Sequence, residues 1–508
     1  MKATCFTKNG IQQTISMLFL FALFFCGGCS SKKDQTLKNE KSSIRIYPNN
    51  PFYWEYKNKP ILLLGGTMDD NLFQIAGLTE HLKLLQSVGG NYVRCTMSSR
   101  DKNNVKPFLK RDDLYDLNKS NPAYWRKFEE LLAVAEKLDI IVQVEIWATY
   151  DFYWGATNWA QNPFNPKLNH NYTVEESLLP DTVDYPPQSK INPFFQTVSS
   201  HNSNETVLRY QRQFVDKLLS VSLKYPNVLY CIDNENMVGP EWPKYWSSYI
   251  REQAQKLGRT IYVTEMWDKW DPTDGRVTGA VTQNPGLGEW YAQYSNMDLY
   301  ANATVSNTIE DAQSYQFVEV SNNNAQRGEV HYKTSVYVRN VLEESAQPRP
   351  ITNVKIYGSD EIEPNEWAGP RKNAEACFWR NIFAGHASSR FHRPPWGLGL
   401  TEYAQHQIKS MRALTNAMDF FAHLPANMLL SEREANEAFC LAKEADEYAV
   451  YFPAAGKVVL NAVDGLYELK WLHIQSSAWL EAEVIRLPGV LETPDQDQWA
   501  LLLKKLDK

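Results

Sequence analysis

The sequence predicts an α/β protein, a (β/α)8 TIM barrel followed by a small C-terminal antiparallel β-sandwich. Strand-like and helix-like segments alternate from about residue 60 onward, which is typical of strands joined by crossover helices. The strand-like segments are continuous apolar runs, which indicates parallel strands buried on both faces. After about residue 425 the pattern changes to short alternating segments separated by turn residues, which favours an antiparallel sandwich.

Eight strand-like segments precede that change, the number that closes a barrel of this kind. They cover Ile61 to Leu64, Asn91 to Thr96, Ile140 to Trp147, Val228 to Ile232, Thr260 to Thr264, Gln316 to Val320, Ile351 to Tyr357 and Ser389 to His392. An open doubly wound sheet is the alternative. It would need a glycine-rich phosphate loop after the first strand, and Gly65-Gly66-Thr67 is not one.

The domain boundaries follow from these patterns. We expect a catalytic barrel over residues 46–424 and a sandwich over residues 425–508. The longest insertion, residues 151–203, follows the third strand and is rich in Asn, Pro and aromatic residues. Long loops within compact domains are usually functional, and this one leaves from the strand end where barrel active sites form.

The first residues are typical of a secretory signal: Lys2 and Lys8 precede an apolar segment, residues 15–25, that is too short to cross a bilayer. Gly27-Gly28-Cys29 resembles a bacterial lipobox. Residues 1–29 are therefore expected to be a lipoprotein signal peptide with lipidation at Cys29, and residues 30–45 a flexible tether. The chain would then be anchored at the bacterial outer membrane or cell surface, or be periplasmic. A plain signal peptide cleaved nearby is the alternative.

The composition bears on partners. A net charge of -7 provides no basic surface for nucleic acid, so no nucleic-acid partner is expected. The predicted lipid anchor is the only membrane contact expected. The chain contains 16 Trp, 27 Tyr and 22 Phe, and their flat faces suit the rings of an oligosaccharide or polysaccharide. No HExxH, Walker or GxSxG motif occurs, so no cofactor and no metal are predicted. Cysteines 95, 231, 377 and 440 are expected to be buried thiols.

In a closed barrel the residues that follow the strands converge on one mouth. Here those residues are carboxylates, amides and Trp, the groups that glycoside hydrolysis uses. One carboxyl group protonates the leaving oxygen, and a second attacks the anomeric carbon or activates water. The predicted mouth residues include Asp69, Arg100, Glu145, Trp147, Asn234, Glu235, Asn236, Trp267, Glu319, Asp360, Glu361, His392 and Arg393.

Asn234-Glu235 at the end of the fourth strand is the strongest motif. Together with Pro60 to Asp70, Tyr225 to Val228 and Tyr448 to Leu460, it makes the chain resemble clan-A glycoside hydrolases. More narrowly, the chain resembles the apiosidase-like hydrolases of Bacteroidetes, which carry a C-terminal module of collagen-binding type. The resemblance implies that Glu235 is the general acid/base and that Asn234 binds the sugar hydroxyl next to the reacting carbon. The alternative is that Glu235 caps the helix that begins near residue 239.

The second carboxylate departs from the family pattern. Relatives place a nucleophilic Glu after the seventh strand, where this chain has Lys355. Glu319, Asp360, Glu361 and Glu145 are the available substitutes. An inverting mechanism or lost activity is also open. Lys355 could pair with Glu235 or Glu319, or it could lie at the barrel rim and reach solvent.

The remaining candidates would bind substrate. His392, Arg393 and Trp396 are expected to form a substrate-binding wall, with Trp396 as a stacking face; a well-packed turn is the alternative. Asp69 and Arg100 could hold sugar hydroxyls or a uronic carboxylate, or could be salt-bridged across the mouth. Trp147 and Trp267 could be platforms, although core packing is the commoner fate of any single Trp. The sequence thus predicts a glycoside hydrolase acting on a polysaccharide-derived oligosaccharide, with a catalytically inactive glycan-binding lipoprotein as the alternative.

Overall fold

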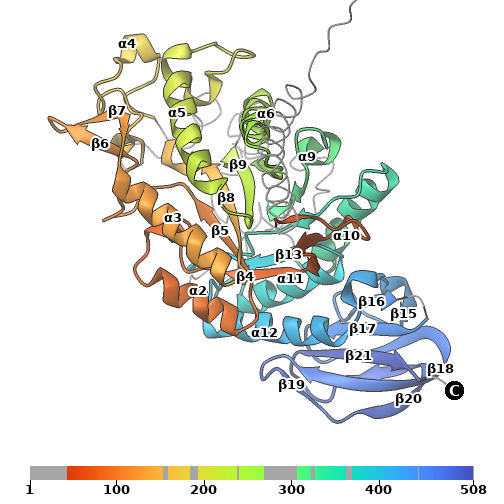
Figure 1. Ribbon diagram of the computed structural model, residues 1–508. Coiled ribbons are helices and arrows are strands. Elements are labelled where there is room, and N and C mark those ends of the chain that lie inside the picture. The colour runs from red at the N-terminus through yellow and green to blue at the C-terminus, as the bar shows by residue number, and fades with distance from the viewer. Residues whose placement is uncertain are drawn as a thin grey trace, which may run out of the picture.

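The computed structural model describes residues 43–152, 158–183, 193–236, 240–267, 306–321, 327–361, 369–443 and 445–506. Within these ranges a barrel of parallel strands is wrapped by helices, and an antiparallel β-sandwich lies beside it (Figure 1). Cys29, the predicted signal peptide and most of the predicted tether lie outside the described residues. No helix in the described ranges combines the length and apolar character needed to cross a membrane.

Six parallel strands form one sheet in the order β10-β9-β8-β5-β4-β13. Their bounds are β4 (Leu63–Gly66), β5 (Tyr92–Thr96), β8 (Ile141–Trp147), β9 (Val228–Asn236), β10 (Val263–Trp267) and β13 (Ser388–Phe391). Two further strands, β11 (Val318–Glu319) and β12 (Ile351–Thr352), pair with each other in parallel. All seven residues of β8 are buried, as expected for a strand covered on both faces.

Backbone hydrogen bonds connect β11 and β12 to the two edges of the six-stranded sheet. The Gln316 N–H donates to the Val263 carbonyl at 2.9 Å on one side, and the Ala387 N–H donates to the Ile351 carbonyl at 2.8 Å on the other. Eight parallel strands therefore close into a barrel, which confirms the predicted fold class and excludes the open doubly wound sheet.

Helices follow the strands and cover the outside of the barrel (Figure 1). They are α2 (Leu78–Ser87), α3 (Pro122–Lys137), α5 (Glu205–Ser222), α6 (Glu241–Lys256), α9 (Ser306–Glu310), α10 (Gly328–Glu344), α11 (Arg371–Phe383) and α12 (Glu402–Ala417). In α3, Pro122 takes the first helical position and the Asn121 side chain accepts a hydrogen bond from the Ala123 N–H. Both features satisfy the helix start without a lost backbone bond.

Several short strands and one short helix add to the barrel. They are β1 (Arg45–Ile46), β2 (Trp54–Tyr56), β3 (Lys59–Ile61), β6 (Phe108–Arg111), β7 (Leu114–Ser120) and α4 (Val174–Ser177). The free cysteines of the described chain, Cys95, Cys231, Cys377 and Cys440, are buried as predicted.

The sandwich is built from antiparallel strands around its own apolar core. Its strands are β14 (Leu424–Pro425), β15 (Leu430–Ser431), β16 (Phe439–Lys443), β17 (Glu447–Phe452), β18 (Lys457–His473), β19 (Ala478–Trp479), β20 (Glu483–Glu492) and β21 (Trp499–Lys505). The turn residues Asp464-Gly465 do not end a strand, because β18 continues through them with a register shift against β20 between Leu460 and Gly465. Such a bulge absorbs extra residues while pairing continues on either side.

The sandwich packs on the barrel through α11 and α12, on one side of the molecule (Figure 1). Trp379 of α11 stacks on Tyr451 of β17, with ring centroids 4.8 Å apart and an interplanar angle of 15°. Apolar residues of both parts belong to one continuous buried cluster. The two parts therefore share a core along this contact.

Candidate active site

A buried arginine organises the polar groups at the carboxyl ends of the barrel strands. Arg94 of β5 is 0% exposed. Its Nε donates to Glu145 Oε1 at 2.5 Å and its Nη1 donates to Asp70 Oδ1 at 2.5 Å. Its Nη2 donates to Asn234 Oδ1 at 2.9 Å. Because a buried charge is tolerated only when it is paired, this guanidinium ties together the ends of β4, β8 and β9.

Glu235 lies at the end of β9 in a left-handed backbone conformation, with φ of 62°. Few residues other than glycine adopt this conformation, and strained residues that persist tend to cluster at functional sites. The Glu235 side chain is 30% exposed. It does not cap the following helix, because Pro240 holds the N-cap position of α6 and the Glu235 carboxylate is engaged elsewhere.

Lys355 is the cation that engages this carboxylate. Its side chain is only 2% exposed, and its Nζ donates to Glu235 Oε1 and, at 2.5 Å, to Asn234 Oδ1. Of the two pairings that the sequence left open, the structure shows the one with Glu235. Asn234 therefore receives both Arg94 and Lys355, which fixes the amide beside the carboxylate.

The environment of Glu235 lowers its pKa. Burial raises the pKa of this carboxyl group, but the charge and hydrogen bond of Lys355, followed by the charge of Arg94, outweigh that effect. The net shift is downward, so Glu235 is a carboxylate at neutral pH in the free protein.

Replacing Lys355 with Met is expected to raise the pKa of Glu235, because burial raises this pKa and the charge that chiefly lowers it would be removed. Met keeps most of the side-chain volume in this buried position. The titration of Glu235, followed by carboxyl NMR, should move to higher pH. A matched Lys457→Met variant changes an exposed lysine on the C-terminal sandwich and should leave this titration unchanged. An unmoved or lowered titration in Lys355→Met would contradict the assigned pairing.

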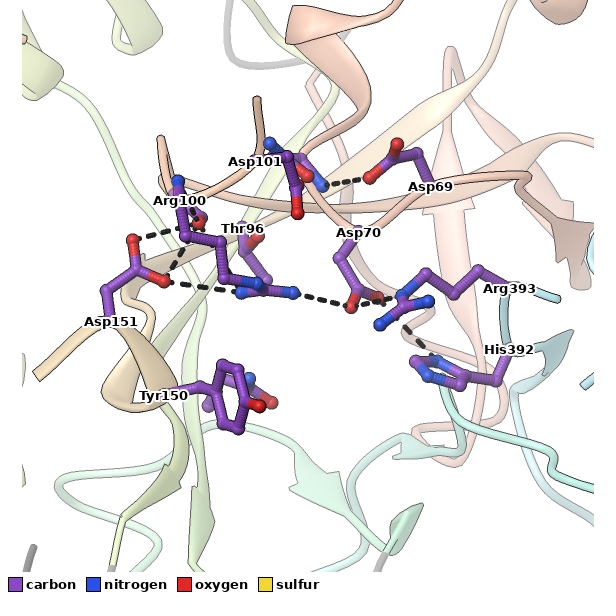
Figure 2. A network of polar contacts seen from close by, with 12 residues as sticks. Asp69, Asp70, Thr96, Arg100, Asp101, Tyr150, Asp151, His392 and Arg393 are labelled. Atoms are coloured by element: carbon purple, nitrogen blue, oxygen red, sulfur yellow. Dashed lines mark hydrogen bonds and ion pairs between the residues drawn. The ribbon is translucent and has the colours of Figure 1, made fainter. Parts of the chain in front are cut away.

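Asp70 is the second anchor of the mouth, and Figure 2 shows the guanidinium groups of Arg100 and Arg393 converging on it. Arg100 Nη2 donates to Asp70 Oδ2 at 3.1 Å and Arg393 Nε donates to the same oxygen at 2.8 Å. Burial raises the pKa of Asp70, but the charges of Arg94 and the neighbouring cations hold it well below its usual range. Asp70 is thus a permanent counter-ion that positions the arginines.

His392 lies 3.7 Å from Asp70, through Nδ1 and Oδ1, and its ring packs on Tyr357 with centroids 4.3 Å apart. Burial lowers the pKa of His392 well below its usual value, and Arg94 and Lys355 lower it further. The imidazole is therefore neutral in the physiological range, and it can donate or accept a hydrogen bond without carrying charge.

The insertion after the third strand reaches this network through Asp151. Arg100 Nη1 donates to Asp151 Oδ1 at 3.3 Å (Figure 2). The Ser98 hydroxyl donates to Asp151 Oδ2 at 2.8 Å. Arg100 also lies over the Tyr150 ring, 5.1 Å from its centroid. Of the two roles predicted for Arg100, sugar binding and a salt bridge across the mouth, the structure shows the salt bridge, to Asp70 and Asp151. Asp69 is half-buried, and its Oδ1 accepts the Asn71 N–H at 3.3 Å.

The other candidate carboxylates differ from Glu235 in their surroundings. Glu319 is buried, accepts the Ser321 N–H at 2.8 Å and the Thr352 hydroxyl at 2.9 Å, and has its pKa raised by burial. Asp360 is largely exposed and paired with Arg371 at 3.1 Å, beside the start of α11. The neighbouring Glu361 is exposed.

Glu145 is fully buried and receives Arg94. Compared with Glu145 and Glu319, Glu235 is the carboxylate that both belongs to the mouth network and faces solvent.

The predicted aromatic platforms have different placements. Trp147 is 1% exposed and lies among Phe152, Phe194 and Trp242, so its faces are covered by core neighbours. Trp396 is 36% exposed, so part of its side chain faces solvent. The side chains of Asn236 and Trp267 lie outside the described residues.

Sequence reasoning did not single out Arg94 or Asp151, and it named Asp69, not the adjacent Asp70, as a substrate-binding candidate. A charge inside the apolar run Tyr92–Thr96 was the available signal, because a buried arginine needs buried partners. Across the described ranges, no group of His, Cys, Asp and Glu side chains is arranged to hold a metal ion.

No protein-family model matches the chain, and no curated protein is significantly similar to it in sequence. Solved structures share its fold. A glycoside hydrolase family 5 protein from Bacteroides vulgatus is similar with a TM-score of 0.59 and 12% identity, covering 92% of this chain and 94% of that one. A further structure, a glycoside hydrolase, is similar with a TM-score of 0.57 and 10% identity, covering 92% of this chain and 98% of that one. The similarity extends over barrel and sandwich together, and it establishes that this chain has the architecture of these glycoside hydrolases.

Proposed function

We propose that the protein is a glycoside hydrolase that cleaves glycosidic bonds in a polysaccharide-derived oligosaccharide, with Glu235 as general acid/base. The observation that carries the proposal is the placement of Glu235 at the end of β9: it is part of the mouth network and is 30% exposed. Barrel enzymes place their reactive groups at this end of the strands. The glycoside hydrolases that share the architecture support the same reaction class.

The charge state of Glu235 suits a proton-exchanging role in two stages. In the free protein Lys355 favours the ionised form, which can accept a proton. A sugar ring that covers the mouth would exclude water and raise the carboxyl pKa, which is the direction that a general acid requires. Arg94 and Lys355 both hold Asn234, whose amide would meet the sugar hydroxyl beside the reacting carbon.

We propose that a second carboxylate of the barrel acts together with Glu235. Glu319 and Glu145 are the candidates within the barrel, whereas Asp360 is engaged by Arg371 and Glu361 is exposed at the rim. The separation between the two carboxyl groups during reaction sets the outcome, at about 5 Å for retention and roughly 6.5–9.5 Å for inversion. Membership of the apiosidase-like hydrolases, with a collagen-binding type of C-terminal module, belongs to the same proposal.

A glycan-binding protein without catalysis is the second candidate, and the ion pair between Lys355 and Glu235 favours it. A Glu235 carboxylate that is ion-paired with Lys355 would still accept hydrogen bonds from a sugar. The site would nevertheless lack the second carboxylate that hydrolysis needs. In this case His392, Arg393, Arg100 and Trp396 would serve recognition alone.

One experiment separates the two candidates. The purified protein is incubated with a panel of plant and host oligosaccharides while product anomers are followed by NMR and binding is measured by calorimetry. Release of a product with a defined anomeric configuration supports the hydrolase and tells retention from inversion. Binding without any product supports the glycan-binding protein and overturns the hydrolase.

We also propose that the chain is secreted and anchored through a lipid on Cys29. A Cys29→Ala variant expressed in a Bacteroidetes host should move from the membrane fraction to the soluble fraction and should lose labelling by a fatty-acid probe. Unchanged membrane association would contradict the anchor.

A further inference from the structure

A groove of about 580 Å³ lies at the junction of the barrel and the sandwich. It opens where the last residues of α12 meet β18, β19 and β21, and Figure 1 shows β19 at the edge of the sandwich below α12. Trp479, Leu480 and Leu502 form its apolar part. The groove shares no lining residue with the barrel mouth, and binding sites occur preferentially at such contacts between domains.

Trp479 provides a fixed aromatic surface in this groove. Its strand, β19, pairs with β18, where Trp479 lies opposite Leu472. The half-buried indole packs against the continuous core cluster and also lines the groove. The adjacent Leu480 is 43% exposed. Pairing and packing hold the ring in place, so a ligand would meet an ordered flat face at a low entropic cost.

The charged residues of the groove cancel. The lining contains Lys470 and Lys504 together with Glu468 and Glu481. Lys470 Nζ lies 3.0 Å from Glu468 Oε1, and Lys504 Nζ lies 3.1 Å from Glu447 Oε2 and donates to the Ala417 carbonyl at 2.7 Å. A polyanion would therefore find no net attraction here, whereas a neutral ligand rich in hydroxyl groups would find both donors and acceptors.

We propose that this groove is a second, non-catalytic binding site for a neutral oligosaccharide. A pyranose ring has an apolar C–H face that fits Trp479 and Leu480, and its hydroxyl groups can bond to Lys470 and Glu468 at the rim. The site would hold a polysaccharide chain on the sandwich while another part of the polymer reaches the barrel mouth. Two linked sites raise the affinity for a long chain without a new contact at either one.

The test is affinity electrophoresis of the full chain in gels that contain neutral xyloglucan, neutral arabinogalactan or acidic polygalacturonate. All proteins carry Glu235→Gln, so cleavage does not alter the gel. Trp479→Ala and Leu480→Asp are compared with the parent and with Leu466→Asp, which changes an exposed leucine of β18 that does not line the groove. Melting temperatures establish that each variant is folded. If Trp479→Ala is not folded, the comparison between Leu480→Asp and the parent decides the test.

We expect at least one neutral polysaccharide to retard the parent, and the two groove variants to bind it about tenfold more weakly. Leu466→Asp should match the parent. Equal retardation of the parent and the groove variants would overturn the proposal, as would retardation by polygalacturonate alone or by no polysaccharide. The hydrolase proposal is judged separately, because hydrolysis of short oligosaccharides by a chain with intact Glu235 should not depend on Trp479.

Discussion

Replacing Glu235 with Gln is expected to lower kcat by about three orders of magnitude, because proton transfer by a positioned side chain contributes roughly 10²–10⁴-fold. Gln keeps the size and the hydrogen-bonding oxygen of the side chain but cannot ionise. Substrate binding should persist, since Arg94 and Lys355 still hold Asn234 in place. The measurements are the rate of product release under saturating substrate and the Kd by calorimetry.

The controls for this variant come from the other candidate carboxylates. Glu361→Gln changes an exposed carboxylate and should leave kcat within about twofold, because groups that do not touch the substrate contribute little to the transition state. Glu319→Gln tests the buried candidate on β11 directly. Undiminished hydrolysis by folded Glu235→Gln would falsify the assignment of Glu235, and a large loss in Glu361→Gln would move the chemistry to the rim.

Replacing Arg94 with Met is expected to lower the free energy of unfolding by about 3–5 kcal/mol, the cost of leaving a buried charge without its partner. Asp70 would keep Arg100 and Arg393. Glu145 would not be compensated: it is fully buried, its Oε1 receives Arg94, and its Oε2 has no hydrogen-bond partner within the described chain. Urea denaturation followed by tryptophan fluorescence measures the change.

Two comparisons identify the cause of that loss. The double variant Arg94→Met/Glu145→Met removes both charges, and it should be more stable than Arg94→Met alone if the orphaned carboxylate causes the damage. Arg486→Met breaks an ion pair with Asp464 whose side chains are both largely exposed, and it should cost under about 1 kcal/mol. A double variant that is as unstable as or less stable than Arg94→Met would show that lost packing dominates instead.

The architecture was predictable because it depends on patterns within short segments. Continuous apolar runs such as Ile141–Trp147 mark strands covered on both faces, and eight of them separated by helices imply a closed barrel. The polar residues directly after Val228 to Ile232 could be placed at the barrel mouth for the same reason. The sandwich was predictable in outline, although the bulge that carries β18 through Gly465 depends on its partner strand and not on local turn signals.

The arrangement within the mouth was not predictable to the same degree. Trp147 is the last residue of the third strand, where a substrate platform would lie, yet its neighbours in space bury it. Asp69 and Asp70 are adjacent in sequence, but only Asp70 is turned toward Arg94, Arg100 and Arg393. Side-chain direction at a strand end depends on the local backbone path, which composition and spacing do not specify.

By itself, the sequence determined the class of fold, the order of the strands along the chain and the position of Glu235 at the end of the fourth. Only the tertiary structure decided which charges meet. Arg94 bonds residues 24, 51 and 140 positions away, and Lys355 reaches Glu235 across 120 positions. Such pairs form because barrel closure brings the ends of distant strands within hydrogen-bonding reach, and no local pattern along the chain encodes that proximity.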